Sequence, residues 1–208
     1  MLRLTPVVKN IIIINVLFFV GQALAPQVNF SDCNGRSMDA ITGFLSMWNV
    51  RTDCFKPYQL FTYMFVHGGF MHIFFNMLAL AFMGPILESF WGQKRFTLFY
   101  LVTGIGAGVF NIAVDLLFGV GSFGIMLGAS GAVYGILMGF GMVFPNMEVQ
   151  LLIPPIPIKA KYLVLVLGGL NFMMDRSGEV AHFAHLGGVI FAFILIRLWK
   201  HQGGGGYN

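Results

Sequence analysis

Two polar residues that could form a nucleophile and its base lie in separate apolar stretches of the chain. Ser130 stands in the sequence Gly128-Ala129-Ser130-Gly131, near the start of one stretch, and His185 lies about as far into another. A serine hydroxyl attacks a peptide carbonyl efficiently only when an adjacent base accepts its proton. Ser130 and His185 would supply this pair if their helices bring them together, whereas a lone serine is more often a packing residue.

His72 and Asn76 lie four residues apart in an earlier apolar stretch and therefore on one face of a helix. Both side chains can donate hydrogen bonds to an oxygen that becomes negative during acyl transfer. Their alternative role is an interhelical hydrogen bond that holds the helices together. Buried polar groups in a membrane need partners, so we expect these two residues to share one polar pocket with Ser130 and His185.

Two further residues bear on how the base would be oriented. Tyr134 lies one turn after Ser130 and could stack against His185, or it could be an ordinary core aromatic. Asp115 is the only carboxylate near the membrane interior, and it lies at the end of its own apolar stretch. We therefore predict a Ser–His dyad without an acidic third member.

The composition shows what kind of structure must position these residues. Of the 208 residues, 57% are hydrophobic and only 10% are charged, which is far too apolar for an average soluble domain. A helix that crosses the bilayer needs roughly 20 apolar residues. Six stretches approach that length, at about 7–25, 70–90, 96–118, 126–144, 160–174 and 180–199. We predict an all-α, polytopic bundle of six transmembrane helices, one domain over residues 1–202, and a flexible tail over 203–208.

The charges predict how this bundle is oriented. The N-terminus, the C-terminus and two connections on the same side carry eight basic and two acidic residues, whereas the other side carries four basic and six acidic residues. Basic loops stay in the cytoplasm, so both termini are expected there. We expect the first stretch to be a retained signal-anchor. The small size and the lack of a presequence favour a bacterial inner membrane.

Small residues could bring the nucleophile and the base together. Gly131, Gly135 and Gly139 recur every fourth residue, and Ala184 and Gly188 lie in the stretch that holds His185. Small residues at this spacing let two membrane helices approach closely. If the two stripes face each other, Ser130 meets His185.

The loop from about residue 26 to 69 is the longest connection and is rich in aromatic residues, which favours a position in the membrane interface. It contains both cysteines, Cys33 and Cys54, on the side predicted to be outside. A disulfide between them and two free thiols are equally compatible with the sequence.

Three motifs resemble those of the rhomboid family of intramembrane serine proteases: HGGFMHIFFN at 67–76, GASGAVYG at 128–135 and AHLGG at 184–188. The similarity covers residues 57 to 199 approximately. It implies that Ser130 is the nucleophile and His185 the general base, and that the oxyanion is held by His72, Asn76 and the Ser130 backbone amide. It also implies supporting roles for the following residues: Gly128, Tyr134 and His67.

The resemblance implies hydrolysis of transmembrane segments of other proteins near the outer membrane face, with residues 172–180 capping the pocket as part of a gate. Two features depart from the family pattern. The loop reads Tyr58-Gln59 where the family often has Trp-Arg, which puts that loop's brace in doubt, and His182 is an additional histidine without an assigned role.

The nearest alternative is an inactive rhomboid-like protein that binds membrane helices for quality control, although such a protein would be expected to lack the serine or the histidine. A metal-dependent enzyme is disfavoured because no His-Glu-x-x-His string occurs. An aspartyl protease would need two facing carboxylates, and a transporter would be expected to show a broken-helix repeat. We expect no metal, no small-molecule cofactor and no nucleic-acid partner; the partners are the lipid bilayer and transmembrane protein substrates.

Overall fold

The computed structural model describes residues 3–30, 33, 36–119, 124–151, 155–174 and 182–201. Four of its helices are long and apolar enough to cross a membrane: α1 (Pro6–Leu24), α4 (Phe70–Trp91), α5 (Gln93–Phe118) and α8 (His182–His201). Two shorter apolar helices are α6 (Ser130–Val143) and α7 (Leu163–Met174), the latter preceded by the 3-10 turn η3 (Ala160–Tyr162). Each of the six predicted stretches thus contains a helix, and the protein is a mostly helical, polytopic membrane protein.

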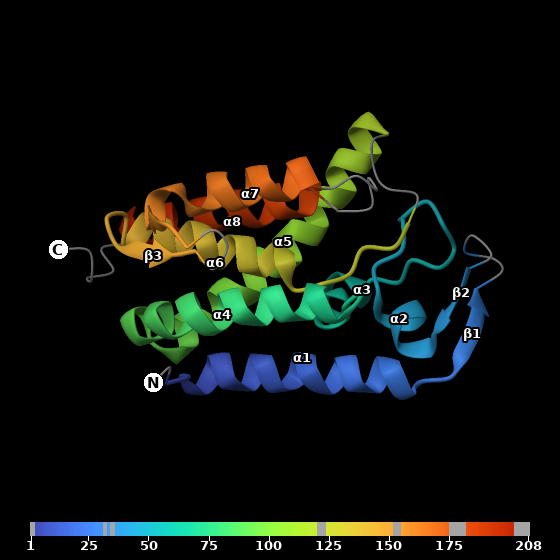
Figure 1. Cartoon of the computed structure of the whole chain (residues 1–208). Helices are drawn as coiled ribbons and strands as arrows, with labels where there is room; N and C mark the ends of the chain where they lie inside the picture. The colour runs from blue at the N-terminus through green and yellow to red at the C-terminus, as the bar shows by residue number, and fades with distance from the viewer. Residues whose placement is uncertain are drawn as a thin grey trace.

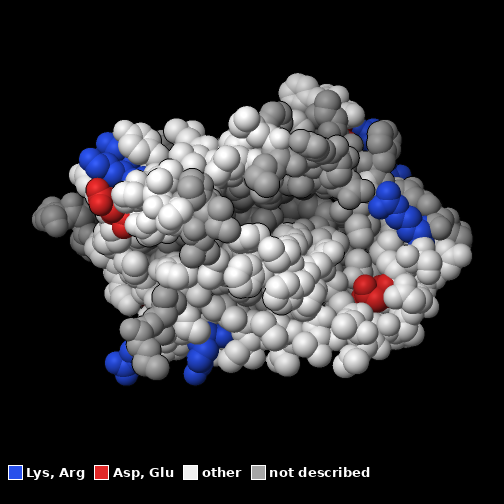
Figure 2. All heavy atoms as spheres, in the orientation of Figure 1, with Lys and Arg blue, Asp and Glu red and all other residues white. Residues whose placement is uncertain are grey.

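Helices α1 and α4 run side by side along the length of the molecule, and α5 is inclined to them (Figure 1). The start of α1 and the end of α8 lie at one end of the molecule, and the elements of the long loop lie at the other. In the face drawn in Figure 2, charged side chains gather at these two ends, and the band between them is uncharged. An uncharged band between two charged ends is what a bilayer core and its two polar interfaces require.

The long loop is more structured than a connection between two helices needs to be. It contains the antiparallel hairpin of β1 (Gln27–Phe30) and β2 (Arg36–Asp39), then α2 (Ala40–Leu45), α3 (Gln59–Thr62) and the 3-10 turn η2 (Tyr63–Phe65). A second hairpin, β3 (Glu148–Gln150) with β4 (Pro157–Lys159), connects α6 to η3. The all-α prediction therefore missed two short hairpins, both outside the apolar stretches.

A buried carboxylate joins the start of α1 to the end of α4. Glu88 is 2% exposed, and its oxygens accept hydrogen bonds from the Thr5 hydroxyl at 2.5 Å and from the backbone N–H groups of Val7 at 3.1 Å and Val8 at 2.9 Å. The first N–H groups of a helix lack intrahelical acceptors, and the helix dipole favours a negative charge there. Glu88 thus caps α1 from another helix, which explains how a charged side chain is accommodated in the core.

Helix α6 lies at the centre of the bundle, and its small residues face mainly α5. A Cβ atom added at Gly131 would lie 2.5 Å from the Cβ of Ala107, and one added at Gly135 would lie 2.6 Å from the Cβ of Thr103. Helix α8 meets α6 at one point of this stripe, where a Cβ on Gly188 would overlap the carbonyl of Gly131. The small residues of α6 and α8 thus meet beside Ser130 and His185, as expected from the sequence, and Gly135 of the same stripe packs against α5.

Candidate active site

Ser130 and His185 lie within hydrogen-bonding distance of each other. Ser130 is the first residue of α6, His185 lies in the first turn of α8, and the Ser130 Oγ to His185 Nε2 distance is 2.8 Å. The contact is only partly buried, so the hydroxyl remains approachable. With Nε2 as the acceptor, the histidine is placed to take the hydroxyl proton during a nucleophilic attack.

The ring of His185 is held by packing. Tyr134, one turn after Ser130 on α6, stacks on it with the ring centroids 4.3 Å apart and the planes at 15°. The Tyr134 hydroxyl donates to the backbone oxygen of Leu167 in α7 at 3.3 Å, which fixes the tyrosine in turn. His182 approaches the same imidazole edge-on, at 6.3 Å between centroids. Tyr134 thus fixes the plane of His185 by stacking, which is the contact predicted for it.

His72 lies over the backbone that leads into Ser130. A Cβ on Gly128 would lie 2.6 Å from Cε1 and 2.7 Å from Nε2 of the His72 ring, and Gly128 has a φ of 116°. Glycine is therefore required twice at this position, for the space and for the backbone conformation. The ring of His72 lies where it can reach a group bound beside Ser130.

A backbone amide selects the tautomer of His72. The N–H of Gly68 donates to His72 Nδ1 at 3.3 Å. A neutral imidazole that accepts at Nδ1 carries its proton on Nε2. The nitrogen that faces Gly128 is therefore the donor, as an oxyanion-binding histidine requires.

Asn76 is buried one turn after His72, and its Nδ2 donates to the backbone oxygen of His72 at 2.8 Å. A side-chain amide has two N–H groups, and this bond uses one of them. The bond ties Asn76 to its own helix, α4, and fixes the amide one turn below His72. Asn76 and His72 therefore share one face of α4, as their spacing predicted.

His67 supports the segment before Ser130 from outside the helices. The N–H of Ala129 donates to His67 Nε2 at 3.5 Å, and Gln22 of α1 pairs with both backbone groups of His67 at 3.0 Å each. Burial, together with the neighbouring His72, lowers the pKa of His67 to about 3. The imidazole is therefore neutral at physiological pH, and its Nε2 can act as an acceptor for the Ala129 amide.

The long loop holds the other side of the same segment. Met47 and Met126 exchange two backbone hydrogen bonds, at 2.9 and 2.8 Å, and the N–H of Gly128 donates to the carbonyl of Tyr63 at 2.9 Å. Residues 126–129 are thus fixed by the loop, by η2 and by His67. This support makes α6 begin at Ser130, four residues later than the apolar pattern predicted.

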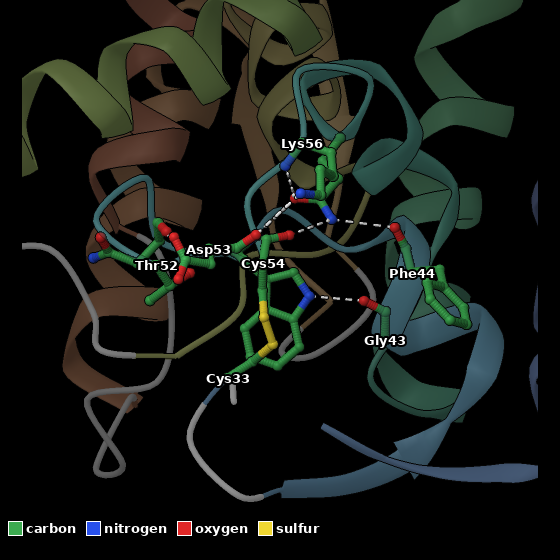
Figure 3. The surroundings of a disulfide bond; sticks show 10 residues. Cys33, Gly43, Phe44, Thr52, Asp53, Cys54 and Lys56 are labelled. Atoms are coloured by element: carbon green, nitrogen blue, oxygen red, sulfur yellow. Dashed lines mark hydrogen bonds between the residues drawn. A yellow bond between two sulfur atoms is a disulfide. The ribbon is translucent and has the colours of Figure 1, made fainter. Parts of the chain in front are cut away.

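Gln59 braces the loop where the family pattern was found to depart. Its side chain is 1% exposed, and its Oε1 accepts from the backbone N–H groups of Trp48 at 3.3 Å and Lys56 at 3.1 Å. Its Nε2 donates to the carbonyls of Phe44 and Cys54, at 3.2 Å each (Figure 3). One glutamine thus satisfies four backbone groups of three loop segments. Sequence reasoning identified the position as doubtful but missed this role.

Cys33 and Cys54 form a disulfide, which settles the question that the sequence left open. The bond ties the turn of the β1–β2 hairpin to the segment that Gln59 also holds, with the two Cα atoms 5.9 Å apart (Figure 3). Beside it, Trp48 is buried and its indole N–H donates to the Gly43 carbonyl at 2.7 Å. The hairpin, α2 and the segment 49–57 therefore act as one cross-linked loop.

Asp115 is hydrogen-bonded to residues of this loop and not to His185. At the end of α5 it accepts from the side chains of Asn49 at 3.2 Å and Arg51 at 3.4 Å. Within the described part of the chain, no carboxylate is hydrogen-bonded to His185 and no group of three His, Cys, Asp or Glu residues could hold a metal ion.

Of the predicted capping segment 172–180, residues 175–180 lie outside the described residues, as do the tail and part of the connection 119–125.

Comparisons with known proteins show which family the chain resembles. The family model of the Rhomboid domain matches residues 55–201. The chain is 32% identical over 140 residues to RHOMBOID-like protein 1 of Arabidopsis thaliana, covering 67% of the chain and 34% of that protein. It is 33% identical over 126 residues to Rhomboid protein 1, mitochondrial, of Saccharomyces cerevisiae, covering 60% of the chain and 36% of the relative.

A third relative aligns with most of the chain. Rhomboid-type serine protease 2 of Emericella nidulans is 31% identical over 214 residues, covering 93% of the chain and 38% of its own length. The chain thus spans between a third and two fifths of the length of these three curated relatives. The matched domain includes Ser130, His185 and the residues that lie around them from α4, α6 and α8, whereas Gln22 and the loop residues before position 55 lie outside it. The chain belongs to the rhomboid family.

Proposed function

We propose that the protein is an intramembrane serine endopeptidase that uses a Ser130–His185 dyad. The single observation that carries the proposal is the 2.8 Å contact between Ser130 Oγ and His185 Nε2. The partly exposed position of this contact and the stacking of Tyr134 on the base support it, because a dyad without an acidic member needs another means of orienting its imidazole.

The reaction would proceed in two steps. Ser130 Oγ attacks the substrate carbonyl carbon while His185 Nε2 takes the hydroxyl proton, and His185 then gives this proton to the leaving amine as the C–N bond breaks. Water attacks the resulting ester, its proton passes to His185, and the acid product leaves as Ser130 regains its proton.

Three donors would stabilise the oxyanion in both steps: the Nε2–H of His72, an Nδ2–H of Asn76 and the backbone N–H of Ser130. The last of these belongs to the first turn of α6, where N–H groups have no intrahelical acceptor. Donors fixed before the reaction stabilise developing charge without reorganisation. His72 is fixed by Gly68, and Asn76 is fixed by its bond to the His72 carbonyl.

We propose transmembrane segments of other membrane proteins as substrates, cut near the outer face. The dyad lies where α6 and α8 begin, at the end of the bundle that carries the long loop. A helical substrate must unwind locally, because its carbonyls are otherwise engaged in the helix. The residues before α8, which the sequence assigned to a cap and gate, remain a prediction.

We further propose that the chain spans the membrane six times as a single domain over residues 1–202, with α6 and α7 as the two shorter spans. Both termini would face the cytoplasm, because basic residues dominate the end where α1 begins and α8 finishes. The tail over 203–208 and the bacterial inner membrane stay predictions from the sequence.

The decisive test uses the purified full chain and its Ser130→Ala variant in liposomes with a tagged transmembrane substrate. The proposal predicts cleavage by the wild type and none by the variant. Cleavage that persists in Ser130→Ala would remove Ser130 as the nucleophile. The alternative, a helix-binding protein without activity, predicts substrate that co-purifies with the wild type and is never cut.

A further inference from the structure

A groove between the first turns of α1 and α5 is separate from the candidate active site. It has a volume of about 460 Å³ and lies at the end of the molecule opposite the long loop. Its lining comes from one residue of α1 and five residues of α5: Val7, Gln93, Lys94, Thr97, Leu98 and Leu101. The groove is shallow and wide open to its surroundings.

The lining changes from polar to apolar along α5. Gln93, Lys94 and Thr97 come first, at the end of the helix, and Leu98 and Leu101 follow toward the middle of the apolar span. Leu98 is 49% exposed, so the part of the groove lined by Leu98 and Leu101 is open to the surrounding hydrocarbon. A phospholipid has the same order, with a polar headgroup at the interface and acyl chains below it.

The charge of the groove selects among lipids. Lys94 is its one cation, and the residues that line it include no carboxylate. Glu88, which is hydrogen-bonded to the backbone of the lining residue Val7, is buried and also accepts from Thr5 and Val8. An ammonium at headgroup depth favours an anionic headgroup over a zwitterionic one by about 1 kcal/mol, or about fivefold in affinity.

The neighbouring cations are directed elsewhere. Arg95 places its guanidinium over the ring of Trp199 in α8, 5.7 Å from the centroid. Lys161 lies over the ring of Tyr162 in η3 at 5.1 Å, and neither residue lines the groove. Lys94 is thus the cation among the residues that line the groove.

We infer that this groove is a binding site for one anionic glycerophospholipid, with the phosphate at Lys94 and an acyl chain against Leu98 and Leu101. The site requires only that the start of α5 lies at a membrane interface. The lipid site does not depend on peptide cleavage, so a failure of the proposed protease function would not affect it.

The test is native mass spectrometry of the purified full chain titrated with phosphatidylglycerol or phosphatidylcholine of identical acyl chains. The wild type is expected to bind one phosphatidylglycerol about fivefold more tightly than phosphatidylcholine. Lys94→Gln is expected to abolish this preference. Lys161→Gln removes the same charge at another surface position and is expected to retain it.

A second variant and a soluble competitor separate a lipid site from simple charge attraction. Leu98→Gln is expected to weaken both lipids and leave their ratio unchanged, because it alters only the acyl half. Glycerol phosphate is expected not to displace phosphatidylglycerol. The inference is overturned if Lys94→Gln keeps the preference, if Lys161→Gln loses it equally, or if glycerol phosphate competes.

Discussion

Gly188 of α8 lies so close to the backbone carbonyl of Gly131 in α6 that no Cβ fits between them. This contact is one residue from Ser130 along α6 and three from His185 along α8. Two helices can approach this closely only where side chains are absent. The distance between Ser130 and His185, the proposed nucleophile and base, is therefore set by a glycine pair that does no chemistry.

Gly188→Ala is expected to separate α6 from α8 and to lower the rate of substrate cleavage together with stability. Forcing a methyl group into a packed contact costs about 1–3 kcal/mol. Thermal unfolding in detergent and cleavage in liposomes measure the two effects. Gly169→Ala in α7 is the control, because a Cβ there meets no atom within 4 Å. Equal behaviour of the two variants would show that the Gly131–Gly188 contact does not set the site.

His72→Ala is expected to reduce kcat by about 10²–10³, the usual effect of removing one oxyanion donor, and to leave folding intact. The reason is the Nε2–H that faces the segment before Ser130. Steady-state cleavage of a transmembrane substrate gives kcat, and circular dichroism reports the fold. An unchanged kcat would assign His72 to packing alone.

Gln59→Ala is expected to destabilise the outer end of the protein, because it removes the Gln59 hydrogen bonds of three backbone groups, at Trp48, Cys54 and Lys56, and one of the two donors to the Phe44 carbonyl. Each buried group left unpaired costs about 1–3 kcal/mol. Tyr58→Phe is the control, since its hydroxyl donates to the same Phe44 carbonyl from an exposed position. A melting temperature lowered equally by both variants would contradict the bracing role of Gln59.

Reduction of the Cys33–Cys54 disulfide is expected to lower the free energy of unfolding by about 3 kcal/mol, given the 21-residue separation that it closes. Unfolding in detergent with and without a thiol reductant measures this. The double variant Cys33→Ala, Cys54→Ala should match the reduced wild type and should not respond to reductant. A response that persists in the double variant would mean that the reductant acts elsewhere.

The lowered pKa of His67 leads us to expect that the protein becomes less stable as the pH falls. Its pKa is about 3 in the folded protein and near 6.5 in an unfolded chain, so the unfolded state binds the proton first as the pH falls. Stability should therefore decrease from about pH 6.5 toward pH 3. His67→Gln, which retains an acceptor for Ala129, should show a shallower decrease. Unfolding midpoints between pH 7 and 4 test this, and identical slopes would contradict it.

The membrane helices were predictable because an apolar run of roughly 20 residues is nearly sufficient to define a span. The start of α6 was not, because Gly128 adopts a φ of 116° and the bonds from Met47 and Tyr63 hold the preceding residues out of the helix. These partners are more than sixty residues away. The hairpins β1–β2 and β3–β4 were missed because strands of three or four residues carry too little alternation to recognise.

The types and spacing of the candidate site residues were accessible from the sequence, since Ser130, His185 and His72 stand out in apolar surroundings. The residues that hold these side chains in place could not be identified from the sequence. Gln59 and Gln22 are ordinary polar residues in the sequence, and only the fold places them against backbone groups of distant segments. Likewise, nothing in the sequence indicates that Gly135 of α6 packs against Thr103 of α5.

The proposed mechanism requires that His185 activates Ser130. The most direct measurement is labelling with a fluorophosphonate probe, followed by mass spectrometric mapping of the adduct. One adduct is expected, on Ser130, and it is expected to be lost in His185→Ala. An adduct on another residue, or labelling of Ser130 that persists undiminished in His185→Ala, would contradict it.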